Sequence, residues 1–217
     1  MRRRLVFANR LEAGRLLGEQ LAAIELVRPL VLALPRGGVP VGAEIARMLR
    51  APLDVTLVRK IGAPHEPELA VGAVAEGPSP EIVVNHEVAR ALGLSDDFIA
   101  AEGAREYATI AQRRSEYAAC GPTCEIAGRT AIVVDDGVAT GMTMRAALRS
   151  VRRGQPARLI AAAPVASREA IAMLREEADD VVCLSSPGSF GSVGSFYRDF
   201  EQVSDAEVVE LLKLRRS

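Results

Sequence analysis

The segment IVVDDGVATGMTM (132–144) places two adjacent carboxylates, Asp135 and Asp136, between an apolar run and a loop of small residues. Backbone N–H groups over 139–143 would stand at the start of a helix, where the helix dipole favours an anion. Adjacent carboxylates repel a phosphate, but they accept hydrogen bonds from vicinal hydroxyls or hold a hydrated Mg²⁺. A sugar phosphate satisfies both halves of the segment, with its phosphate on the loop and its hydroxyls on the acids.

The loop that follows the acids is predicted to bind a phosphomonoester. Gly141 lets the backbone approach a ligand closely, and the hydroxyls of Thr140 and Thr143 add hydrogen-bond donors. The spacing excludes a Walker A loop, because the required G-x-x-x-x-G-K-[ST] and its lysine are absent. A helix cap is the competing interpretation, and it explains one aspartate but not two followed by T-G-M-T. The predicted phosphate-binding residues are Ala139, Thr140, Gly141, Met142 and Thr143.

Two further loops carry residues suited to a diphosphate. In the PRGG turn, Gly37 and Gly38 permit backbone conformations closed to other residues and expose N–H groups to an anion. Arg36, Arg59 and Lys60 would supply cationic partners. Only two of the 27 basic residues are lysine, which favours a site where a compact ammonium is required. The competing interpretations are a plain strand-to-helix turn for PRGG and a solvated strand end for Arg59 and Lys60.

Apolar runs without alternation, separated by segments of helical period, predict an α/β fold with a mostly parallel sheet and helices on both faces. Ligands bind such a sheet at the carboxyl ends of its strands, so the loops that leave those ends meet at one edge. The predicted strands are 29–34, 53–58, 70–75, 81–85, 130–134, 158–163 and 180–184, and the predicted helices are 10–27, 39–50, 86–93, 96–118, 142–153, 167–178 and 205–214.

Three segments of the chain resemble the type I phosphoribosyltransferases. The signature of that family is an apolar run, two acids, a few small residues and T-G-x-T, and IVVDDGVATGMT (132–143) matches it. LPRGGVPVG (34–42) is similar to the family's pyrophosphate loop, and VRKIGAPHEPE (58–68) is similar to the start of its mobile catalytic loop. The resemblance covers about 28–200 of the chain.

The resemblance implies an architecture and an activity. The architecture is a single domain over 1–217 with a helical insertion at about 86–120 and a C-terminal hood segment at about 185–217. The activity is transfer of a 5-phosphoribosyl group from 5-phosphoribosyl 1-diphosphate (PRPP) to a nucleobase-like nitrogen acceptor, with Mg²⁺ as cofactor and pyrophosphate as product. A PRPP-binding regulator without transferase activity, or a protein that hydrolyses the sugar phosphate, stays open as an alternative.

The same resemblance gives roles to particular residues. The two acids would bind the ribose hydroxyls and the metal, and the basic residues would stabilise the departing diphosphate. A mobile loop over 61–69 would exclude water, and Glu66 or Glu68 on that loop would handle the acceptor's proton. The residues with predicted catalytic roles are Asp135, Asp136, Arg36, Arg59 and Lys60.

The acceptor is the least determined part of the prediction. Ala139 stands where family members that use 6-oxopurines carry an aspartate, so the motif looks more like that of the adenine enzymes. A purine is therefore one candidate acceptor, and other nitrogen heterocycles stay open. Phe190, Phe196 and Tyr197 are predicted to be able to stack on the acceptor ring.

Composition bounds the partners and the location. The formal net charge of −1 over 217 residues argues against a nucleic-acid partner, because such proteins usually carry a basic excess. No apolar run approaches the roughly 20 residues that span a bilayer, and three cysteines form no disulfide framework, so we expect a cytoplasmic protein without a membrane partner. Tyr107, Ile110 and Tyr117 share one helical face, which predicts a core contact or a homodimer contact.

Overall fold

A five-stranded parallel sheet carries the predicted loops. The computed structural model describes residues 6–77, 81–118 and 123–215, without the side chains of 67, 68, 118, 214 and 215. The strand order is β2-β1-β6-β7-β8, and every neighbouring pair is parallel. The strands are β1 (Leu30–Ala33), β2 (Leu53–Val55), β6 (Thr130–Val134), β7 (Arg158–Val165) and β8 (Asp180–Ser185).

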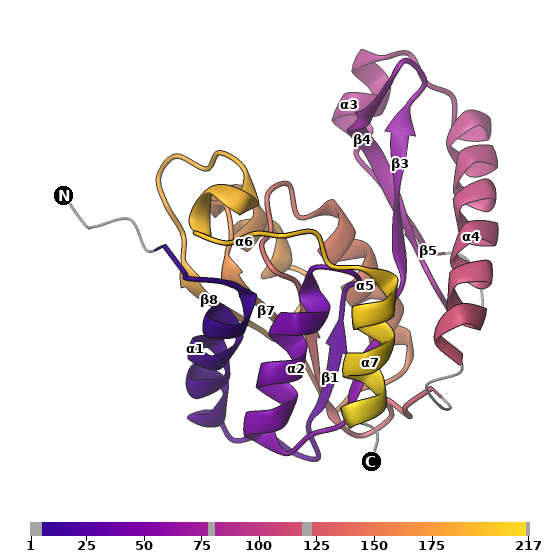
Figure 1. Cartoon of the computed structure of the whole chain (residues 1–217). Coiled ribbons are helices and arrows are strands. Elements are labelled where there is room, and N and C mark those ends of the chain that lie inside the picture. The colour runs from indigo at the N-terminus through magenta and orange to yellow at the C-terminus, as the bar shows by residue number, and fades with distance from the viewer. Residues whose placement is uncertain (1–5, 78–80, 119–122, 216–217) are drawn as a thin grey trace.

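Helices cover both faces of this sheet (Figure 1). Val31 and Ile132 pack in one core with α1 (Arg10–Ala22), α2 (Gly38–Leu49) and α7 (Asp205–Arg215). Their neighbours Leu32 and Val133 pack in a second core with α5 (Met142–Arg153) and α6 (Arg168–Leu174). Because the strands are buried on both sides, their sequences are continuous apolar runs rather than alternating ones. The prediction of a mostly parallel sheet with helices on both faces is confirmed.

A second, antiparallel sheet stands beside the first in Figure 1 and has the order β3-β4-β5. Its strands are β3 (Val58–Ala63), β4 (Glu66–Ala75) and β5 (Glu81–Val84). The predicted helical insertion is present as α3 (His86–Ala91) and α4 (Asp96–Ala118), and α4 packs along all three strands. Ile110 and Tyr117 of α4 are buried in the core that α7 shares, so the core interpretation is confirmed for these two side chains.

Two predictions over residues 53–69 were wrong. The predicted strand 53–58 ends after Val55, and the chain crosses to the antiparallel sheet before Val58. The predicted mobile loop 61–69 is instead a hairpin, in which β3 and β4 pair across a turn at 64–65. Ile61 is buried and pairs with Gly72, so apolar packing and ladder hydrogen bonds organise a segment that looked polar in sequence.

The C-terminal segment covers the carboxyl edge of the main sheet. The Phe7 N–H donates to the Phe196 carbonyl at 2.8 Å, and the Arg198 N–H donates to the Phe7 carbonyl at 2.9 Å. The short helix η1 (Val193–Phe196) therefore lies against the strand-like segment before α1. Helix α7, which the sequence placed in the hood, instead packs against α2 and β2 in the main core.

Candidate functional site

The two acids and the PRGG turn meet at the carboxyl edge of the main sheet. Asp135 and Asp136 follow β6, the PRGG turn follows β1, and these two strands are neighbours in the sheet. A Cβ on Gly37 would overlap the Asp136 carboxylate, and one on Gly38 would lie 2.7 Å from the Val134 carbonyl oxygen. Only glycine fits at these positions, because the acid-bearing loop fills the space. The peptide bond between Pro35 and Arg36 is cis.

Burial makes both carboxylates costly to ionise. The pKa of Asp135 is raised well above its ordinary value, first by burial and then by the charge of Asp136, although the Asp136 N–H donates to Asp135 Oδ1 at 2.9 Å. Burial also raises the pKa of Asp136, against the opposing effect of Arg10. Two partly desolvated acids side by side are stabilised by hydrogen-bond donors or a cation, which is what a ribose diol or Mg²⁺ supplies.

Arg10 contacts this site, and no pattern in the sequence predicted it. Its Nε donates to Asp136 Oδ2 at 2.8 Å, and its Nη1 donates to the Glu201 carbonyl at 2.7 Å. The guanidinium carbon lies 3.8 Å from the centre of the Phe200 ring. Because Arg10 is 126 positions from Asp136 in the chain, no local motif joins the two residues.

The predicted phosphate loop ends at the start of α5. Gly141 is the N-cap residue with φ +83°, a left-handed conformation that favours glycine, and among the described residues no side chain caps this helix end. The Ala139 carbonyl accepts a hydrogen bond from Ser167 Oγ at 2.7 Å, which holds the loop against α6. Thr140 is exposed and Thr143 is half-buried. The amides at the start of α5 can therefore receive an anion.

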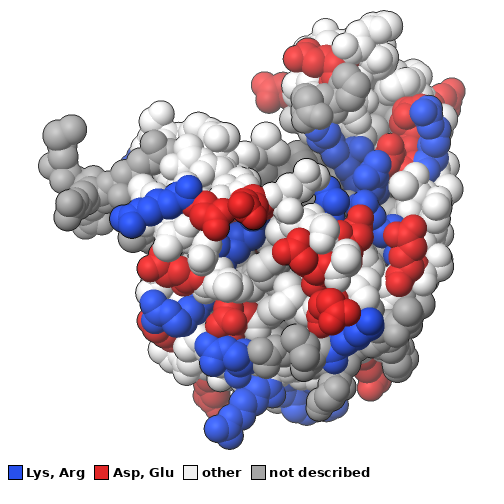
Figure 2. All heavy atoms as spheres, viewed as in Figure 1, with Lys and Arg blue, Asp and Glu red and all other residues white. Residues whose placement is uncertain are grey.

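A cleft of about 770 Å³ brings the other predicted residues together. Arg59 and Lys60 of β3 line it together with Pro35 of the PRGG turn and Thr143 of the phosphate loop. Helix α4 forms the opposite wall, and Arg59 Nε donates to Glu106 Oε2 of that helix at 2.7 Å. Figure 2 shows basic side chains gathered where the antiparallel sheet meets the main body.

The side chain of Arg36 in the PRGG turn lies on the side of the turn away from this cleft. It lines a hollow of about 380 Å³ together with Arg10, Gly37, Asp136 and the segment 200–203. The predicted cations are thus divided between two spaces: Arg59 and Lys60 face the cleft beside α4, while Arg36 faces the hollow beneath the C-terminal segment.

The predicted aromatic contacts with an acceptor were wrong for two of the three residues. Phe196 is fully buried and Tyr197 is 6% exposed, because both pack against Phe7 in a small core at the sheet edge. The Tyr197 hydroxyl donates to the Asp136 carbonyl at 2.5 Å. Phe190 is partly buried, and its ring centroid lies 5.2 Å from that of Phe196. These rings support the acid-bearing loop.

Of the two predicted handlers of the acceptor's proton, the structure describes the side chain of Glu66 only. Glu66 is exposed where β4 begins, and the side chain of Glu68 lies outside the described residues. Within the residues that the structure describes, no cluster of three or more His, Cys, Asp or Glu side chains could hold a metal. Cys124 and Cys183 form no disulfide in the described part of the chain, and no described helix is long and apolar enough to cross a membrane.

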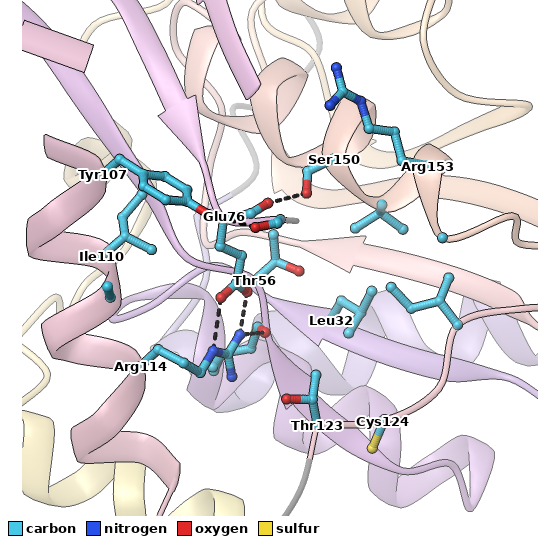
Figure 3. Close-up of a pocket in the computed structure, with 16 residues that line it drawn as sticks. Leu32, Thr56, Glu76, Tyr107, Ile110, Arg114, Thr123, Cys124, Ser150 and Arg153 are labelled. Atoms are coloured by element: carbon cyan, nitrogen blue, oxygen red, sulfur yellow. Dashed lines mark hydrogen bonds and ion pairs between the residues drawn. The ribbon is translucent and has the colours of Figure 1, made fainter. Parts of the chain in front are cut away.

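Another hollow, of about 530 Å³, lies away from the predicted residues (Figure 3). The side chain of Arg114 is paired there with both oxygens of Glu76, and its Nη2 also donates to the Val55 carbonyl at 2.9 Å. The Tyr107 hydroxyl donates to the Gly77 carbonyl at 2.5 Å, and the Ser150 hydroxyl donates to the Glu76 carbonyl. These polar groups bond one another and join the two sheets.

Comparisons with known proteins agree with this geometry. A family model described as phosphoribosyl transferase domain matches residues 8–201. Two Mycobacterium tuberculosis proteins with provisional phosphoribosyl transferase names, MT0597 and Rv0571c, are each 40% identical over 207 residues, covering 95% of this chain and 46% of theirs. The chain thus spans about half the length of the curated relatives it matches.

A solved structure is similar over nearly the whole chain. The crystal structure of TT1426 from Thermus thermophilus is 43% identical, has a TM-score of 0.83, and covers 97% of this chain and 99% of its own. The matched family region contains the acid pair, the PRGG turn and the phosphate loop, which are the segments that meet at the sheet edge. The chain therefore belongs to the phosphoribosyl transferase domain family.

Proposed function

We propose that this domain binds PRPP and transfers its 5-phosphoribosyl group to a nucleobase-like nitrogen acceptor, releasing pyrophosphate. The observation that carries the proposal is the close fit of Gly37 against the Asp136 carboxylate. That fit brings a turn suited to a diphosphate within reach of acids suited to a ribose. The start of α5, beyond the same acids, is suited to a 5-phosphate.

Each part of the donor has a place in this proposal. The 5-phosphate binds the amides and hydroxyls of 139–143, and the ribose hydroxyls donate to Asp135 and Asp136. The diphosphate lies on the PRGG turn, with cations from Arg36 on one side and from Arg59 and Lys60 on the other.

The acids fit a magnesium ion that arrives with the donor. Mg²⁺ commonly keeps several waters and uses one or two carboxylates plus substrate phosphates, and the described residues offer Asp135 and Asp136 rather than a complete protein cage. When bound, the ion supplies charge neutralisation for the leaving diphosphate.

The residues of the chain favour separation of charge in the donor. As the bond from the sugar to the diphosphate breaks, the sugar becomes positive, as in glycoside cleavage, and the nearby acids stabilise it. Lys60 and Arg59 stabilise the negative charge that grows on the diphosphate. The wall that α4 adds to the cleft limits the access of water, which would otherwise hydrolyse the donor.

The preference for an acceptor is inferred from a carboxylate that this motif lacks at position 139. Ala139 is exposed beside the acids, and no acid occupies its position in the motif. Guanine and hypoxanthine would lack the base that handles a ring proton, and a positioned general base is worth about 10²–10⁴-fold. Adenine or another nitrogen heterocycle is therefore the better acceptor, and Ala139→Asp improves the oxopurines.

A pyrophosphate-release assay with PRPP, Mg²⁺ and a panel of heterocycles tests the proposal. Release that depends on both PRPP and one heterocycle supports transfer, and release without any acceptor indicates hydrolysis. PRPP binding without release on any compound would instead support the regulatory alternative. Efficient turnover of guanine would contradict the argument from Ala139.

A further inference from the structure

Arg10 joins three segments that are far apart in the sequence. From the start of α1 it donates hydrogen bonds to the Asp136 carboxylate, which follows β6, and to the Glu201 carbonyl. Its guanidinium also lies over the face of the Phe200 ring. The side chains of Arg10 and Asp136 are only 12% and 13% exposed, so solvent screens their attraction weakly. A guanidinium suits this place because it can bond a carboxylate and a carbonyl while it stacks on an aromatic ring.

The contacts of Asp136 leave part of the acid pair available. Hydrogen bonds from the described residues reach Asp136 Oδ2, from Arg10, and Asp135 Oδ1, from the Asp136 N–H. The second oxygen of each aspartate accepts no hydrogen bond from the described residues, while the first one is held by Arg10 or by the backbone.

We propose that Arg10 is a positioning residue of the donor site, which aims the Asp136 carboxylate at the ribose hydroxyls. This inference rests on the proposed function. Tyr197 supports the same loop from the backbone side, because its hydroxyl donates to the Asp136 carbonyl. Arg10 contacts no donor atom in this proposal and acts through Asp136.

The choice of ligand separates positioning from simple structural support. PRPP and ribose 5-phosphate both carry the hydroxyls that Asp136 would bind, whereas inorganic pyrophosphate carries none. A loss of general structure weakens all three ligands, but a loss of Asp136 orientation weakens only the two that contain ribose.

Isothermal titration calorimetry of Arg10→Gln with each ligand and Mg²⁺ tests the proposal. We expect PRPP and ribose 5-phosphate to bind about 10- to 100-fold more weakly, as when a group that orients a ligand-binding side chain is removed, and pyrophosphate to be unaffected. Arg15→Gln is the matched control, because Arg15 lies on the same helix in an exposed pair with Glu19 at 2.6 Å. That control should leave all three affinities unchanged.

Further variants keep the test decisive if Arg10→Gln does not fold. Arg10→Lys keeps the charge but not the fork of donors, and should weaken the two ribose ligands by an intermediate factor. In Asp136→Asn, adding Arg10→Gln should cost little more ribose 5-phosphate affinity, because Arg10 acts through that carboxylate.

The outcomes distinguish this inference from the proposed function. Wild-type protein that binds neither PRPP nor ribose 5-phosphate refutes both. Wild-type binding that Arg10→Gln and Arg10→Lys leave intact, or a loss that is equal for all three ligands, refutes only the role of Arg10.

Discussion

Two arginine–carboxylate pairs hold distant parts of this molecule together, and their surroundings differ. Arg114 and Glu76 lie between the two sheets, with side chains that are 24% and 21% exposed, and Arg10 and Asp136 lie at the carboxyl edge of the main sheet. Glu76 Oε1 also accepts the Leu57 N–H at 2.9 Å, so both oxygens of Glu76 are bonded within the described chain. Asp136 has one oxygen bonded there.

The number of carboxylate oxygens that accept hydrogen bonds within the chain distinguishes a structural pair from one suited to a ligand. A carboxylate whose lone pairs are all engaged stabilises the fold and offers nothing to a ligand. A carboxylate held on one side and open on the other costs stability unless a ligand completes its bonds. On this criterion the pair with Arg114 supports the fold, and the acids after β6 fit the ligand-binding role of the proposed function.

The largest effect is expected from Asp135→Asn with Asp136→Asn. Stabilisation by PRPP, measured as the shift in melting temperature with ligand concentration, should be lost, because in the proposed function both acids bind the ribose hydroxyls. Stability without ligand should change by no more than about 1 kcal/mol, because the loss of the pair with Arg10 is offset by removing two buried charges whose pKa values burial raises.

Another adjacent pair of aspartates provides the control. Asp96 and Asp97 are exposed at the start of α4, and Asp96→Asn with Asp97→Asn should keep the wild-type response to PRPP. If PRPP raised the melting temperature of Asp135→Asn with Asp136→Asn as much as that of wild type, these acids would not bind the ribose.

Arg114→Ala should instead lower stability and leave the response to PRPP unchanged. We expect the free energy of unfolding to fall by about 2–3 kcal/mol, because Glu76 is left as a partly buried charge without its partner. The shift that PRPP produces should stay as in wild type. Denaturant unfolding measures the loss, and Arg47→Ala, which breaks an exposed pair with Glu44, should cost less than about 1 kcal/mol. Equal losses in the two variants would contradict the structural role of Arg114.

Lys60→Arg tests a smaller, catalytic contribution. Charge is kept while shape changes, so turnover should fall about tenfold and PRPP affinity should fall by less, as expected for a group that acts mainly in the transition state. Steady-state kinetics with PRPP and the best acceptor provide both numbers. Lys213→Arg is the control, because Lys213 is exposed and pairs only weakly with Glu210 at 3.2 Å. If wild type, Lys60→Arg and Lys213→Arg had equal kinetics, Lys60 would be a solvated surface residue without a catalytic role.

The smallest effect concerns a third arginine–carboxylate group. Hydrogen bonds from Arg149 and Arg145 lower the pKa of Glu177, although burial opposes them. A lowered folded-state pKa means that the stabilisation is complete above the unfolded-state pKa and is lost as the pH falls through the folded-state value. Glu177→Gln should therefore cost about 1 kcal/mol at pH 7.

Thermal unfolding across pH tests this effect. The difference between wild type and Glu177→Gln should shrink as the pH falls below the ordinary glutamate pKa of about 4.3, and should vanish below the folded-state pKa, where the wild-type carboxylate is protonated in both states. A difference that stays constant down to the acid limit would mean that packing, rather than charge, holds Glu177.

Local spacing predicted the parts of the site that a short segment determines. The acids, the PRGG turn and the phosphate loop each lie within a few residues after an apolar strand, and the parallel sheet brings them to one edge. The hairpin of β3 and β4 was missed because Pro64 and the polar residues around it are typical of a loop, while pairing with a distant strand decided the structure.

Long-range contacts account for the other errors. Phe196 and Tyr197 were predicted to meet an acceptor because aromatic side chains can stack on its ring. Their burial depends on Phe7, which lies about 190 positions earlier and has no motif of its own. Arg10 was missed for the same reason, since its partners come from β6 and from the segment near Glu201.

The bond between Arg10 and Glu201 also sets the order in which the site can be assembled. It joins residues 191 positions apart, so a growing chain exposes Arg10 long before its partner has been synthesised. Contacts of such high sequence separation form late, after the loop-closure entropy has been offset by the packing of the sheet. A ribosome-bound chain that stops before residue 196 would then carry the acids, the glycine turn and Arg10, but not the Glu201 carbonyl that holds Arg10 in place.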